Sequence, residues 1–202
     1  MPDHVAENYT IEQWIEHIGD APEHDNHWTE LREGKIGEHT RHMNAIQLQR
    51  LAEQRPLHYR RLAESLPDYR DRLPDAAFAA LVDALGRTTR PDRGEADWQP
   101  IDDRSFADII QHSAYLDCGE CDRELAMAIE RRAGFDWPDR VVDRLLAIAQ
   151  AGERRFEQRK HGFADQLLQY RINDAACIAL NALAAIARNH EYRRPQLRPI
   201  AD

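Results

Sequence analysis

Two cysteines, Cys118 and Cys121, form a C-x-x-C sequence close to the predicted start of a helix. A helix N-terminus lowers the pKa of a nearby thiol, so this spacing suits redox chemistry or metal binding. A tetrahedral zinc site needs four ligands, and His112 or Cys177 would have to complete this one. We expect ordinary small residues at a helix start, and we keep zinc, with Cys118, Cys121 and His112 as candidate ligands, as an alternative.

Histidine pairs and nucleotide-binding motifs give no stronger site. His24/His27 and His39/His42 have a spacing that places two side chains on one helix face, but H-E-x-x-H is absent. G-x-x-x-x-G-K-[ST], G-x-G-x-x-G and G-x-S-x-G are absent as well. We therefore expect a non-enzymatic protein with no catalytic residue and no cofactor.

Basic residues are concentrated towards the C-terminus. The chain has 27 Lys and Arg against 36 Asp and Glu, a formal net charge of -9, which argues against a general nucleic-acid binder. Residues 153–202 instead carry nine basic and six acidic residues, with Phe156 and Tyr192 among them. Basic residues interleaved with aromatic ones are typical of single-strand binders, so nucleic-acid binding is an alternative function. Its candidate contacts are Arg154, Arg155, Arg159, Lys160, Arg188, Arg193, Arg194 and Arg198.

Helix signals dominate the 202 residues. Thr10 and Gln13 form a capping box, prolines at 56, 74 and 138 occupy first-turn positions, and Asp174 caps a long last helix. In the helix predicted for residues 38–54, the apolar side carries Met43, Ile46 and Leu51. No stretch alternates long enough to predict a strand, so the predicted fold class is all-α.

The spacing of these helices predicts antiparallel hairpins over residues 40–66, 74–115, 119–151 and 163–189. Hairpins of this size are typical of HEAT and armadillo repeats. We therefore expect an irregular HEAT/armadillo-like α-solenoid of antiparallel helical hairpins, with a compact α-helical bundle as the alternative. Residues 1–37 form an N-terminal helix and a polar loop, and residues 38–202 form the helical-repeat domain.

The last predicted helix is apolar on all sides. Between Ala175 and Ala187 the only polar residue is Asn181. Such a helix must be covered on every side, by the N-terminal helix or by another chain. We therefore expect a protein partner or a second copy to bind there, through Ile178, Leu180, Leu183 and Ile186.

The chain contains no apolar stretch of membrane-spanning length, and its N-terminus lacks the basic and apolar parts of a signal peptide. We expect no membrane contact and a cytoplasmic location.

Several segments together resemble a known family. They include LQRLAEQRPLHYRRLAESLP (48–67), PDAAFAALVDALG (74–86), CGECDRELAMAIERRAG (118–134) and INDAACIALNALAAIA (172–187). Their order is similar to the C-terminal helical-repeat region of large bacterial STAND-type NTPases of antiphage defence. The family's R-x-P-x-x-[FY]-x-x-L-A segment, followed by L-P, is reproduced by Arg55, Pro56, Tyr59, Leu62, Ala63, Leu66 and Pro67. At the last helix, Ala176 and Cys177 stand where the family has Arg and Gly.

The resemblance implies a HEAT-like solenoid that serves as a sensor or an interaction surface, detached from the NTPase module. It brings no ATPase activity and no catalytic residue to this chain. We therefore expect a protein-interaction module whose partners bind along the concave face of the solenoid or at the apolar last helix.

Overall fold

The computed structural model describes residues 3–21, 28–32, 35–38, 40–92, 94–158 and 174–197, and most of these are helical. The α-helices are α1 (Asp3–Ala6), α2 (Ile11–Gly19), α3 (Arg41–Gln54), α4 (Pro56–Ser65), α5 (Asp75–Gly86), α6 (Asp103–Ile110), α7 (Ser113–Leu116), α8 (Asp122–Arg131), α9 (Asp139–Gln158), α11 (Ala175–Asn189) and α12 (Arg194–Leu197). Short 3₁₀ helices are η1 (Leu66–Tyr69), η2 (Gly119–Cys121) and η3 (Glu191–Arg193). The predicted helical class is confirmed for the body of the molecule.

One hairpin departs from the expected polar loop. Strands β1 (Trp28–Arg32) and β2 (Lys35–Glu38) pair antiparallel, with Trp28 opposite Glu38. The register is irregular between Glu30 and Arg32. Strands of five and four residues are too short to give a clear alternating pattern, which is why the sequence did not predict them.

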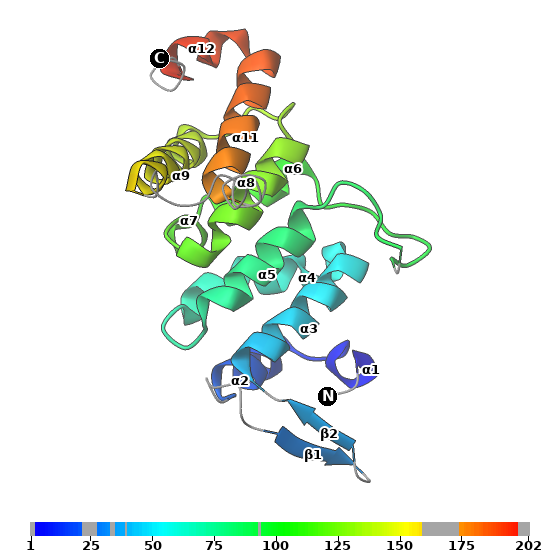
Figure 1. Ribbon diagram of the computed structural model, residues 1–202. Coiled ribbons are helices and arrows are strands. Elements are labelled where there is room, and N and C mark those ends of the chain that lie inside the picture. Colours follow the sequence, from blue (N-terminus) through cyan, green and yellow to red (C-terminus); the bar gives the residue numbers. More distant parts are fainter. Residues whose placement is uncertain are drawn as a thin grey trace.

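Four helices are stacked in succession along the long axis of the molecule. Helix α3 packs on α5, α5 on α8, and α8 on α11, while α9 packs against α11 (Figure 1). The N- and C-terminal ends of the chain lie at opposite ends of this stack. One apolar core cluster continues through it, from Trp14 of α2 to Leu197 of α12.

The helix starts follow the predicted capping residues. The Thr10 hydroxyl accepts from the Gln13 amide at 3.3 Å, and the Gln13 side chain accepts from the Thr10 amide at 2.8 Å. Pro56 begins α4, and the Asp174 carboxylate accepts from the Ala176 amide at 2.9 Å. These contacts satisfy amide groups that have no partner within the helix.

Two helix boundaries differ from expectation. The second half of the hairpin predicted over residues 74–115 is divided into α6 and α7, because His112 adopts an extended conformation and its Nδ1 accepts from the Ala114 amide at 3.2 Å. In contrast, α9 continues through Gly152 to Gln158, beyond residue 151, where the predicted hairpin ends.

Helices α5 and α8 approach closely at Gly86. A Cβ atom at Gly86 would lie 2.4 Å from the Ala128 Cβ, so only glycine fits at this crossing. Next to it, the buried Arg132 guanidinium donates to the carbonyls of Leu85, Gly86, Arg87 and Ile101 at 3.0–3.3 Å. A cation at the C-terminal end of α5 satisfies its last carbonyls and complements the helix dipole.

The C-terminal segment is fastened to the loop between α8 and α9. His190 Nε2 donates to the Phe135 carbonyl at 3.1 Å, and the Tyr192 hydroxyl donates to Asp136. Arg193 donates to Asp136 at 2.9 Å and to the Trp137 carbonyl at 2.6 Å. We call residues 190–197 the C-terminal latch.

Within the described ranges, no helix combines the length and the apolar character needed to cross a membrane.

Candidate protein-binding groove

The structure joins Cys118 and Cys121 in a disulfide, with their Cα atoms 5.3 Å apart. Both residues are completely buried, and η2, which carries Cys121, packs on α5. His112 is exposed at the start of α7. Among the described residues, no group of three or more His, Cys, Asp or Glu side chains is arranged to hold a metal, so the proposed zinc ligands do not come together.

The expected interface on α11 is mostly internal. Ile178, Leu183 and Ile186 are buried, because α8 and α9 of the same chain pack against this helix. These three side chains are therefore covered within the chain itself and do not form an exposed apolar face. Leu180 is the one predicted contact that is exposed, at 39%.

The arginines predicted to bind nucleic acid do not form one exposed surface among the residues that the structure describes. Arg193 is 6% exposed, and its guanidinium binds Asp136 and Asp139, so it is not available to a phosphate backbone. Arg194 is exposed and donates to the Ala187 carbonyl at 3.0 Å, while Arg188 is exposed on α11. Arg154 and Arg155 belong to helix α9 rather than to a connector. Arg159, Lys160 and Arg198 lie outside the described residues.

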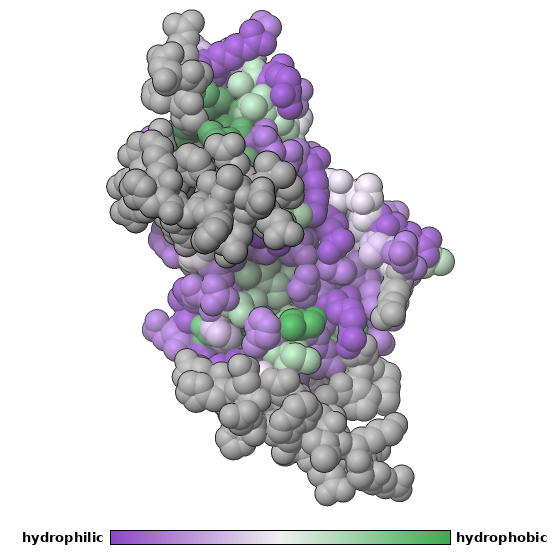
Figure 2. Space-filling view, viewed as in Figure 1, coloured by the Kyte–Doolittle hydropathy of each residue, from purple (hydrophilic) through white to green (hydrophobic). Residues whose placement is uncertain are grey.

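A groove of about 380 Å³ crosses the face formed by α3, α5 and the start of α8. Its floor is made largely of alanines, Ala45 from α3 and Ala76, Ala79 and Ala80 from α5. Its other lining residues are His42, Ile46, Gln49, Asp83, Glu120, Arg123 and Glu124. Figure 2 shows an apolar patch over α3 and α5 that is bordered by hydrophilic residues. We call this the α3–α5–α8 groove.

Two large apolar side chains of α3 are exposed, contrary to the sequence expectation, and one of them, Ile46, lines this groove. Met43 is 38% exposed and Ile46, one turn later, is 42% exposed, although both were expected in the core. The inward face of α3 instead carries two buried polar residues. The Asn44 side chain donates to the His17 carbonyl at 2.6 Å, and His17 Nε2 donates to Gln47 at 3.3 Å. These contacts with α2 turn Met43 and Ile46 outward.

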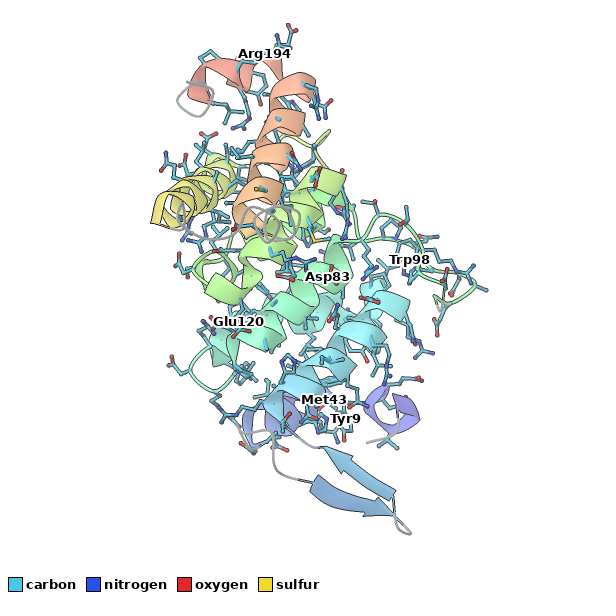
Figure 3. All side chains as sticks on the ribbon, viewed as in Figure 1. Tyr9, Met43, Asp83, Trp98, Glu120 and Arg194 are labelled. Carbon is cyan, nitrogen blue, oxygen red and sulfur yellow. A yellow bond between two sulfur atoms is a disulfide. The ribbon has the colours of Figure 1, made fainter. Side chains whose placement is uncertain are left out.

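Asp83 connects the three helices that form the groove. Its carboxylate accepts from Gln49 of α3 at 2.6 Å and from Arg87 at 3.3 Å. Arg131 of α8 lies 3.7 Å from the same carboxylate. The contacts fix the spacing of α3, α5 and α8, so the groove is a preformed feature. Figure 3 shows Met43, Asp83 and Glu120 on the face that carries it.

The charge of the groove is acidic. Three carboxylates line it, those of Asp83, Glu120 and Glu124, against the single guanidinium of Arg123. Arg123 donates to Glu124 at 3.1 Å. Glu120 is exposed, and none of the described residues forms an ion pair with it.

Two other hollows are built differently. One, of about 270 Å³, lies where the 88–100 loop meets the start of α4; the Trp98 indole N–H donates to the Glu53 carbonyl there, at 2.8 Å. The exposed Leu57 also lines it. The other, of about 320 Å³, lies between Tyr9 and the α2 start on one side and α4 on the other.

The groove residues could not be found by motif, since alanine, isoleucine and glutamate have no diagnostic spacing here. The arrangement offers apolar area, acidic charge and a floor without bulky side chains, which suits docking of a protein segment. A comparison of the chain with known protein families, with curated proteins and with solved structures found no match.

Proposed function

We propose that this chain is a non-enzymatic protein-interaction module built as an irregular HEAT-like α-solenoid. The serial packing of α3 on α5, α5 on α8 and α8 on α11 supports this architecture, because each helix contacts its neighbours in the stack. The resemblance to the helical-repeat region of bacterial defence NTPases supports a role as sensor or scaffold.

The observation that carries the proposal is the exposed Ile46, which lines the α3–α5–α8 groove together with four alanines and lies one turn after the exposed Met43. Clustered apolar side chains rimmed by polar ones mark interaction sites on protein surfaces. The protein-binding surface proposed is therefore the α3–α5–α8 groove. The last helix contributes less, because Ile178, Leu183 and Ile186 are already covered.

Nucleic-acid binding through the C-terminal arginines has less support. Arg193 is neutralised by two carboxylates, and Arg194 forms an ion pair with Glu191 at 3.2 Å. Protein binding at the groove uses side chains that are exposed, so it is the better-supported function.

Site-specific photo-crosslinking in producing cells tests the proposal. A photoreactive residue replaces Ile46 in the groove, Leu57 outside it, or Leu180 on α11, three apolar positions that are all exposed. We expect discrete crosslinked species from position 46 and none in common with position 57. The same adducts from positions 46 and 57, or none from position 46, would contradict the proposal.

A further inference from the structure

We propose that the α3–α5–α8 groove binds a basic amphipathic helix of a protein partner. This inference rests on the proposed function and names the kind of segment that the groove accepts. It follows from three properties of the lining residues: the shape of the floor, the position of the apolar edge and the sign of the charge.

The floor allows a helix to approach closely. Ala45, Ala76, Ala79 and Ala80 come from two helices that lie side by side, and none of them projects beyond its Cβ atom. Helices pack by placing the side-chain ridge of one into the groove of another, and small residues reduce the distance between their axes. The space between α3 and α5 therefore fits a third helix.

The apolar edge matches a helix with one apolar stripe. Ile46 lines the groove with its side chain 42% exposed, and the exposed Met43 lies one turn before it on the same helix. A helix lying in the groove would cover Ile46 with apolar residues spaced three or four apart. This burial gives the occupant its apolar face.

The charge selects a basic flank. Asp83 is held by Gln49, Arg87 and Arg131, whereas Glu120 has no ion-pair partner among the residues that the structure describes. Glu120 and Glu124 lie at the α8 end of the groove. Glu124 already accepts from Arg123 at 3.1 Å, so a lysine or arginine beside the apolar stripe of the incoming helix would pair with Glu120, while an acidic helix would be repelled.

Two labelled peptide probes test the inference with the full chain. The first repeats Lys and Leu in helical register over about five turns, and the second has the same Leu face with Glu in place of Lys. Binding is measured by fluorescence anisotropy. We expect the Lys/Leu peptide to bind and the Glu/Leu peptide not to bind.

Matched variants locate the binding. Ile46→Gln should weaken the Lys/Leu peptide about tenfold, whereas Leu57→Gln, at an apolar position with 56% exposure outside the groove, should change the affinity less than about twofold. Glu120→Gln should weaken binding, whereas Glu130→Gln, at an exposed position that does not line the groove, should not. Ile46→Ala repeats the test if Ile46→Gln does not fold.

Three results would overturn the inference: no binding of the Lys/Leu peptide, equal binding of the Glu/Leu peptide, or equal affinity of wild type and both Ile46 variants. The proposed function has its own test: it would be contradicted if a photoreactive residue at position 46 gave no crosslinks, or the same crosslinks as position 57. Crosslinks that persist without Lys/Leu binding would show that the groove binds proteins of another chemistry.

Discussion

Single side chains hold the helices of this molecule together at their ends. Arg132 is the clearest example, because its guanidinium is almost completely buried and donates to four carbonyls and to Asp103 at 2.5 Å. The guanidinium also lies over the Phe106 ring, 5.0 Å from its centroid. An arginine directly after the end of a charged helix gives no sequence signal of burial, so this contact could be found only in the structure.

Replacing Arg132 by Met should lower the free energy of unfolding by about 3–5 kcal/mol, since carbonyls at the end of α5 and the Asp103 carboxylate would lose their donor. Its neighbour Arg131 is the matched control. Arg131 is partly exposed and 3.7 Å from Asp83, so Arg131→Met should cost about 1 kcal/mol or less. Urea denaturation measures both values, and equal losses for the two variants would contradict this role of Arg132.

The close contact between α5 and α8 requires a residue without a Cβ atom at position 86. Gly86→Ala should destabilise the chain by about 1–3 kcal/mol, because the new Cβ would overlap that of Ala128. Gly134→Ala, where no atom lies within 4 Å of the added Cβ, should change stability by about 0.5 kcal/mol or less. In the double variant, Ala128→Gly should recover part of the Gly86→Ala loss. Additive losses in thermal or urea unfolding would show that the two sites do not meet.

Among the helices, the sequence predicted the residue at which a helix begins better than the side of the helix that is buried. Thr10, Pro56 and Asp174 begin helices as expected, because capping is a local interaction between a side chain and the next turn. The predicted inward face of α3 was wrong, because Asn44 and Gln47 are buried through hydrogen bonds to His17 of α2, a helix distant in the sequence. Hydrophobic spacing assigns polar residues to the surface and cannot anticipate such partners.

The candidate groove could not be predicted from the sequence either, because it depends on contacts between helices that are distant in the sequence. Its lining comes from α3, α5, η2 and α8, and its one large apolar lining residue, Ile46, is a residue that spacing had assigned to the core. The interface expected on α11 differs from the structure for another reason. An apolar helix must be covered, but the sequence did not say that α8 and α9 of the same chain would cover it.

The C-terminal latch is an element whose stability should depend on pH. The Tyr192 hydroxyl and Arg193 donate to Asp136, and these hydrogen bonds lower the pKa of its carboxyl group. A carboxyl with a lowered folded pKa stabilises the protein above its unfolded pKa of about 3.9, and this stabilisation is lost as the pH falls through the folded value.

The free energy of unfolding of wild type should therefore exceed that of Asp136→Asn at about pH 6, and the difference should shrink towards zero as the pH falls through the lowered pKa of Asp136. Asp117→Asn, at an exposed position without an ion pair among the described residues, is the control and should show no such difference. A gap between wild type and Asp136→Asn that is independent of pH would rule out the proposed role of this carboxylate in the latch.

In the molecule as a whole, α8 and α9 cover α11, whereas Met43 and Ile46 are exposed on α3. Helices α8 and α9 pack against α11, and the latch fastens the C-terminal end to the 134–138 loop. The α3–α5–α8 groove lies towards the other end of the stack (Figure 1). Because the two surfaces are separate, we assign partner binding to the groove and not to α11.

The solution mass of the purified chain tests whether α11 is an interface between chains. Light scattering should give a monomer of 23.4 kDa, both at low salt and at about 0.5 M salt, where exposed charges are screened. Leu180→Glu should leave this mass unchanged, because Leu180 is the only one of the four predicted α11 contacts that is exposed. A stable dimer that Leu180→Glu dissociates would contradict the account, since α11 would then be the interface.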